Sequence, residues 1–172
     1  IKILNHFFGL NEMGNSWING VSKHATAIEI KKYLDKKNFK EYYKFTFVRH
    51  PMDWLVSLYE YIKNTRHKDQ NLLKKITFKE FVLREIKKKS PLQIDFLTED
   101  NKFIVDKICK FENIDKDIET LFKILNIDLK KNKLNHLNKS PRVTNFYEYY
   151  DNELEEIVRD YYSKDFKLLG YN

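Results

Sequence analysis

The spacing of apolar positions in the middle of the chain predicts a strand that leads directly into a helix. Residues 43–48 form a short run of aromatic and β-branched side chains, which is typical of a strand. From Pro51 to about Lys63 apolar residues recur with helical spacing, and proline suits the first turn of a helix because its missing N–H costs nothing there. Arg49 stands at the junction between the two predicted elements.

The segment before this strand has the pattern of a helix, a loop and a second helix. Residues 1–8 show the apolar spacing of a short helix. Residues 9–23 are polar and hold three of the four glycines, which indicates a loop. Residues 24–37 predict a helix whose apolar face would carry Ala27, Ile30, Tyr33 and Leu34.

After the central helix, strands and helices continue to alternate. Thr77 and Glu80 form a capping box for a helix that we expect to reach about Lys89. Residues 102–113 alternate enough to be one or two strands, and residues 115–125 predict the next helix. This alternation predicts an α/β fold with a mainly parallel sheet.

The C-terminal part begins with a long polar segment. Residues 126–145 are irregular, and loops of that length inside a small domain are often functional. Asp151 is expected to cap a helix over residues 152–162, and a short tail ending at Tyr171 is expected to follow it. The whole chain of 172 residues is long enough for one domain with its own core, so we expect a single domain over 1–172.

The charge of the chain is positive and unevenly distributed. Lys and Arg number 32 against 25 Asp and Glu, which gives a net charge of +7. Residues 141–172 hold 4 basic and 7 acidic side chains, so residues 1–140 carry +10. Such a balance suggests an anionic partner, but a lysine-rich solvated surface explains it equally well.

Other bulk features exclude some classes of protein. With one cysteine, Cys109, the chain has no internal disulfide, and a lone cysteine in an apolar run is typical of a core residue. No run of 18 apolar residues exists, so no membrane span is expected in this chain.

The junction at Arg49 is where ligand chemistry is expected. Ligands of parallel α/β sheets bind at the carboxyl ends of strands, and the start of the next helix adds N–H groups and partial positive charge. Arg49 is placed to bind a phosphate there, or else to form a structural salt bridge. Ser57 could reach the same phosphate, or could bond back to its own helix.

Four segments in order resemble one family. The segment around residues 45–61 has a strand, Val-Arg-x-Pro, a helix, and a serine eight positions after the arginine; the others are KHATAIEIKKYL, KFEN and residues 137–171. Together they resemble PAPS-dependent carbohydrate sulfotransferases of the Golgi type and their bacterial relatives.

The resemblance implies a fold and a reaction. The fold would be a P-loop-like three-layer domain with a short, mainly parallel sheet flanked by helices. The protein would move a sulfuryl group from the nucleotide PAPS to a hydroxyl of a carbohydrate or another acceptor, leaving adenosine 3′,5′-bisphosphate. No metal is implied, and no nucleic-acid partner is expected.

The resemblance also implies roles for individual residues. Arg49 and Ser57 would bind the 3′-phosphate, and His24 would be the catalytic base, unless it merely precedes a helix. Phe111 would pack against adenine, although packing in the core is the alternative. A polar, basic part of the long loop would close over the nucleotide or remain solvated; its members implied in cofactor binding are Lys139, Ser140 and Arg142.

One element of the family is not seen in the sequence. Related enzymes have a first strand and a Pro-Lys-Thr-Gly-Gly-Thr-Ser-like loop that binds the 5′-phosphosulfate, and no such loop follows a strand here. We therefore expect the strand and the loop to precede residue 1, so the chain as given could be inactive; the alternative is a non-catalytic relative. A basic nucleic-acid-binding module is the other alternative function. A bacterial-type relative would be cytoplasmic, and a eukaryotic one with an N-terminal anchor would lie in the Golgi lumen.

Overall fold

The structure, a computed structural model, divides into two compact units. It describes residues 2–3, 17–18, 21–22, 24–65, 67–127 and 145–172. The first unit comprises residues 1–48 and 93–133, and the second comprises 49–92 and 134–172. The expectation of a single domain over 1–172 stays a prediction.

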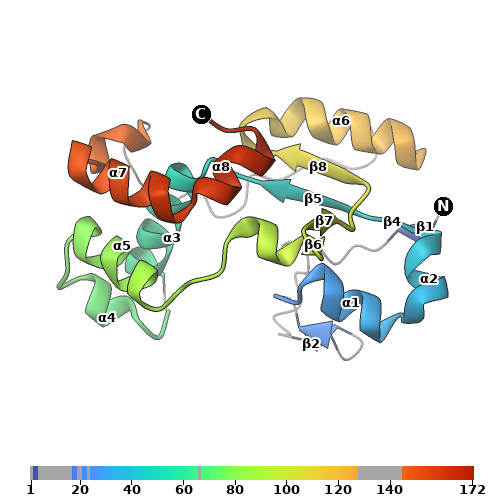
Figure 1. Cartoon of the computed structure of the whole chain (residues 1–172), viewed down its shortest axis with the longest axis horizontal. Helices are drawn as coiled ribbons and strands as arrows, with labels where there is room; N and C mark the ends of the chain where they lie inside the picture. The colour runs from blue at the N-terminus through green and yellow to red at the C-terminus, as the bar shows by residue number, and fades with distance from the viewer. Residues whose placement is uncertain (1, 4–16, 19–20, 23, 66, 128–144) are drawn as a thin grey trace. The chain divides into compact units, whose positions relative to one another are not determined.

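The first unit contains the parallel strand pairs of an α/β protein. Strand β5 (Phe45–Val48) pairs in parallel with β8 (Lys107–Lys110), with Phe45 opposite Lys107. Figure 1 shows the two strands side by side, with α6 (Ile114–Leu125) next to β8. A second parallel pair joins β1 (Lys2–Ile3) to β4 (Tyr42–Tyr43). The expected strands over 43–48 and 102–113 are therefore confirmed.

Two short antiparallel pairs complete the strands described in the first unit. The pairs are β2 (Trp17–Ile18) with β3 (Val21–Ser22), and β6 (Thr98–Glu99) with β7 (Lys102–Phe103). The loop expected over 9–23 thus contains strand pairing. The helix expected over 1–8 is wrong at residues 2 and 3, because their backbone pairs with β4; residues 4–8 lie outside the described part.

The helices of the first unit follow local signals, with one exception in packing. They are α1 (Ala27–Tyr33), α2 (Asp35–Glu41), α6, and the 3₁₀ segments η1 (Gln93–Phe96) and η2 (Phe111–Asn113). Thr26 and Glu29 form a capping box at α1, and its hydrogen bonds lower the pKa of Glu29. Ala27 and Ile30 are buried as expected, but Tyr33 is 53% exposed. The chain enters α2 directly after Leu34, so Tyr33 is left outside the core.

The second unit is helical in its described part. Its elements are α3 (Pro51–Asn64), α4 (Gln70–Leu73), α5 (Phe78–Lys87), η4 (Phe146–Tyr149), α7 (Asn152–Tyr161) and α8 (Ser163–Leu169). The expected start at Pro51, the capping box at Thr77 and the cap at Asp151 are confirmed. The tail expected before Tyr171 is wrong, because residues 163–169 form α8 and bury Phe166 and Leu169.

Helix α3 is the centre of the second unit. It contacts α4, α5 and η4, and its residues Met52, Leu55 and Val56 are fully buried. The same hydrophobic cluster includes residues from α5, α7 and α8. Burial of this apolar face, more than helix propensity, holds α3 in place.

Two tyrosines of this core, the partly buried Tyr150 and the buried Tyr162, should respond differently to loss of their hydroxyl. The Tyr150 hydroxyl donates to the Met52 carbonyl at 2.9 Å, whereas the buried Tyr162 hydroxyl has no hydrogen-bond partner among the described residues. Tyr150→Phe should therefore cost about 1 kcal/mol of unfolding free energy, because a hydrogen bond is lost. Tyr162→Phe should be neutral or stabilising by up to about 1 kcal/mol, since an unpaired polar atom is removed. Urea unfolding of both variants measures the difference; equal losses would contradict the assignment.

Candidate active site

The junction between β5 and α3 places Arg49 and His50 between a strand and a helix. Strand β5 ends at Val48, and α3 begins at Pro51 with its first N–H groups at the same point of the chain. His50 occupies the N-cap position, but its side chain makes no capping hydrogen bond. Its ring is packed among aromatic rings with centroids 4.8–6.4 Å away, those of Phe146, Tyr147, Phe166 and Tyr171.

Arg49 forms an ion pair with Asp53 in the first turn of α3. The Nε–H of Arg49 donates to Oδ2 of Asp53, and the side chains are only 16% and 10% exposed. The salt bridge considered from the sequence is therefore present. It does not exclude a ligand, because a guanidinium carries further N–H donors on its two terminal nitrogens. The pair fixes the arginine at the start of the helix.

Ser57 extends the same row of side chains along α3. Asp53 and Ser57 are four residues apart on α3, so they lie on one face of the helix, and Arg49, which precedes the helix, reaches this face through its ion pair with Asp53. Ser57 is half-buried, and Tyr61, one turn further, is 45% exposed. The row thus leads from the strand end toward solvent, with a cation, a carboxylate and a hydroxyl in succession.

Two tyrosines of the C-terminal segment, Tyr149 and Tyr150, form hydrogen bonds with α3. The hydrogen bond from Tyr150 to the Met52 carbonyl joins the residue after η4 to the first turn of α3. Burial raises the pKa of Tyr150 well above its usual value, so the hydroxyl stays protonated and donates. Tyr149 donates to Glu60 of the same helix at 3.2 Å.

His24 and Phe111 belong to the first unit. His24 is exposed in a turn two residues before Thr26, the N-cap of α1. Phe111 is 38% exposed and opens η2 directly after β8, so it is not a core residue. The backbone N–H of the preceding Lys110 donates to Asp117 of α6 at 2.7 Å, which fixes the end of the strand.

The structure brings some of the expected site residues into one unit and leaves others undescribed. Arg49, just before α3, and Ser57, on α3, lie in the second unit, and His24 and Phe111 lie in the first unit. The loop residues lie outside the described part of the chain; they are Lys139, Ser140 and Arg142. Within the described ranges, no cluster of His, Cys, Asp and Glu could hold a metal ion.

Sequence reasoning missed two residues that position this junction. Asp53 pairs with Arg49, and their spacing of four residues was a readable signal for an ion pair. Tyr150 reaches α3 from 98 positions away in the sequence, and no local pattern indicates such a contact.

Comparison with known proteins identifies the family. The model of the sulfotransferase family matches residues 11–172, which is most of the chain. The chain therefore belongs to the sulfotransferase family, whose members transfer a sulfuryl group. Searches of curated proteins and of solved structures gave no match. Among the described helices, none has the length and apolar character needed to cross a membrane.

Removing the partner of Arg49 should destabilise the second unit. Asp53→Asn removes the carboxylate that pairs with a largely buried guanidinium, so the unfolding free energy should fall by about 2–3 kcal/mol. Glu155→Gln is the matched control, because Glu155 pairs with Arg159 at the same spacing with side chains 30% and 38% exposed. An exposed pair of this kind contributes about 0.5 kcal/mol or less. Chemical denaturation of the two variants gives the comparison, and equal losses would refute the buried pair.

Proposed function

We propose that the protein is a PAPS-dependent sulfotransferase whose acceptor is a carbohydrate hydroxyl. Membership of the sulfotransferase family supports sulfuryl transfer, and the nucleotide donor and the acceptor class are our inference from the sequence motifs. In this proposal β5 and β8 belong to a P-loop-like three-layer domain that spans residues 1–172.

The junction of β5 and α3 is the observation that carries the proposal. An arginine at the carboxyl end of a parallel strand, followed by the N-terminus of a 14-residue helix, is a suitable anion site. In the proposed complex the terminal nitrogens of Arg49 bind the 3′-phosphate bidentately, and the Ser57 hydroxyl donates to it. Asp53 acts as a positioning residue, because its bond to Nε fixes the orientation of the guanidinium.

The proposed reaction is an in-line displacement at sulfur. The acceptor oxygen forms a bond to sulfur while the bond from sulfur to the 5′-phosphate oxygen of PAPS breaks, and adenosine 3′,5′-bisphosphate leaves. His24 takes the proton of the acceptor hydroxyl as general base. Positioning of the donor and stabilisation of the leaving phosphate by cations supply most of the rate, as in phosphoryl transfer.

Four further residues complete the proposed donor site. Phe111, with an exposed ring after β8, is assigned to the adenine. Lys139, Ser140 and Arg142 are assigned to closure over the nucleotide on the strength of the family resemblance. No metal takes part in this proposal.

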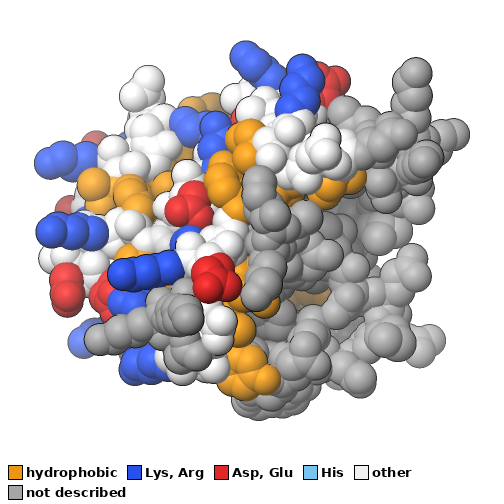
Figure 2. All heavy atoms as spheres, turned by 90° about the vertical axis from the view of Figure 1, so that its right-hand side faces the viewer, with side chains coloured by type: hydrophobic (Ala, Val, Ile, Leu, Met, Phe, Trp, Pro, Cys, Tyr) orange, Lys and Arg blue, Asp and Glu red, His pale blue; other side chains and the backbone are white. Residues whose placement is uncertain are grey.

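The distribution of charge gives little support to a nucleic-acid-binding module. Figure 2 shows Lys and Arg side chains interspersed with Asp, Glu and hydrophobic side chains on the described part of one face. Nucleic-acid binding relies on basic residues that follow the phosphate backbone. A lysine-rich solvated surface accounts for the net charge of +7.

Binding of the reaction product should depend on Arg49. Adenosine 3′,5′-bisphosphate should raise the melting temperature more than adenosine 5′-monophosphate does, because only the former has a 3′-phosphate. Arg49→Ala should weaken bisphosphate binding by about 30-fold or more, and Ser57→Ala by about fivefold, through loss of charge-assisted hydrogen bonds. Arg84→Ala is the control, since Arg84 lies on α5 in the same unit and its ion pair within the described part of the chain is a long one, 4.0 Å to Asp69.

Isothermal titration of the unchanged protein and of the Arg49→Ala, Ser57→Ala and Arg84→Ala variants with each nucleotide measures these affinities. Ser57→Ala keeps the Arg49–Asp53 pair, so it tests the site even if Arg49→Ala unfolds. Equal binding of the two nucleotides, or equal losses in Arg84→Ala and Ser57→Ala, would exclude the 3′-phosphate site.

A change at His24 should affect turnover but not binding of the nucleotide. His24→Gln should lower turnover by about 10²–10⁴-fold, as for loss of a general base, without changing the affinity for adenosine 3′,5′-bisphosphate. Transfer of sulfate from PAPS to oligosaccharide acceptors, followed by mass spectrometry, measures turnover. Unchanged turnover in His24→Gln would rule out the base.

A further inference from the structure

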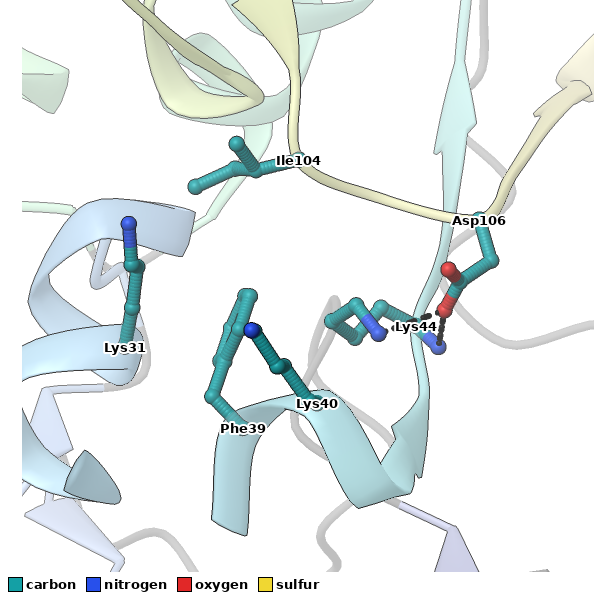
Figure 3. Close-up of a pocket in the computed structure, with 6 residues that line it drawn as sticks. All are labelled: Lys31, Phe39, Lys40, Lys44, Ile104 and Asp106. Carbon is teal, nitrogen blue, oxygen red and sulfur yellow. Dashed lines mark hydrogen bonds and ion pairs between the residues drawn. The ribbon is translucent and has the colours of Figure 1, made fainter. Parts of the chain in front are cut away.

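A hollow in the first unit favours no single class of ligand. Its volume is about 430 Å³, and Figure 3 shows the side chains that line it, which are Lys31, Phe39, Lys40, Lys44, Ile104 and Asp106. Lys44 pairs with Asp106, and Lys31 pairs with Glu99. Lys40 lines an adjoining hollow together with Glu41. These lysines and carboxylates are equal in number, so charge selects no ligand there.

The accessible surface of α3, in the second unit, is narrow and chemically more specific. Between Pro51 and Ile62 the residues that are not buried are Trp54, Ser57, Leu58 and Tyr61. Because they are spaced three and four residues apart, they form one stripe along the helix. A ligand that contacts Ser57 therefore lies against this stripe.

The four residues of the stripe differ in their contacts with the core. Trp54 and Leu58 pack against the hydrophobic cluster of the second unit, and the ring centroid of Trp54 lies 6.2 Å from that of Tyr162. Tyr61 is 45% exposed and is not part of that cluster. Among the residues that the structure describes, neither the Ser57 hydroxyl nor the Tyr61 hydroxyl has a hydrogen-bond partner. Both hydroxyl groups are thus available to a ligand.

The direction in which helical side chains lean favours contact of Tyr61 with a ligand at Ser57. Long side chains on a helix lean toward its N-terminus and cover the surface of the preceding turn. The turn before Tyr61 is the one that carries Ser57, four residues earlier. A phosphate bound by the Ser57 hydroxyl would therefore lie within reach of the Tyr61 hydroxyl.

The ion pair of Arg49 with Asp53 makes further donors useful at this site. Both side chains are largely buried, and the carboxylate offsets part of the positive charge that the guanidinium offers to a phosphate. A phosphate group presents several strong acceptor oxygens, and the terminal nitrogens of one arginine do not satisfy all of them. Hydroxyl groups can donate to the remaining oxygens without the desolvation cost of a second buried cation.

We propose that Tyr61 is a third ligand of the 3′-phosphate. Its hydroxyl donates to an oxygen of the same phosphate that Arg49 and Ser57 bind. The three residues together select a nucleotide with a phosphate, and not a hydroxyl, at the 3′ position, because their hydrogen bonds are strongest to a charged acceptor. The inference rests on the proposed function, from which the identity of the ligand is taken.

Isothermal titration of Tyr61→Phe with adenosine 3′,5′-bisphosphate and adenosine 5′-monophosphate tests this role. The substitution keeps the ring and removes only the hydroxyl of a side chain outside the core, so the fold should be retained. Affinity for the bisphosphate should fall about fivefold through loss of one hydrogen bond, and affinity for the monophosphate should not change. Tyr33→Phe is the matched control, since Tyr33 of α1 is 53% exposed and lies in the first unit; it should change neither affinity.

The contrary outcomes separate the role of Tyr61 from the proposed function. If Ser57→Ala weakens binding of the bisphosphate and Tyr61→Phe does not, the role of Tyr61 is overturned and the donor site stands. An equal loss for both nucleotides in Tyr61→Phe, or an equal loss in Tyr33→Phe, would overturn the contact with the 3′-phosphate. If the unchanged protein binds the two nucleotides equally, both the donor site and the role of Tyr61 are overturned.

Discussion

The parallel pairing of β5 with β8 is the constraint on which the rest of the structure depends. Parallel strands cannot be joined by a tight turn, so a long connection has to lead from the end of one strand back to the start of the other. Here that connection begins at Arg49 and contains α3, α4 and α5, which belong to the second unit. The pairing therefore determines both where the helical unit begins and which residues stand at the strand ends.

The two ends of this strand pair carry different chemistry. At the amino end, the buried Lys44 pairs with the more exposed Asp106, and both residues also accept backbone hydrogen bonds. Beyond the carboxyl end, Arg49 is held by Asp53 on the first turn of α3. Ion pairs of this kind contribute little net stability, because removing charges from water is costly. Their effect is to fix side-chain positions, which is what recognition of an anion requires.

The local elements of the chain follow from short-range rules, and these were predictable. Pro51 starts α3, Thr77 with Glu80 caps α5, and Asp151 caps α7, because each signal satisfies backbone groups within one turn of itself. The placing of Arg49 at the end of a strand and of Ser57 on the following helix was readable for the same reason. The roles assigned to His24 and Phe111 rest on the resemblance and stay predictions.

What only the tertiary structure decided involves partners far apart in the sequence. Residues 2 and 3 belong to a segment, residues 1–8, whose apolar spacing predicts a helix. They form a strand because the backbone of β4 is available to pair with them. Residues 163–169 are helical where a tail was expected, because Phe166 and Leu169 find a core to enter. Local sequence carries no information on such partners, whereas packing and long-range hydrogen bonds override weak local preference. The sequence by itself thus determined the helix starts, the central strand and the candidate phosphate ligands. Tertiary contacts decided the pairing of β1, the burial of α8, and the positioning of the α3 start by Tyr150.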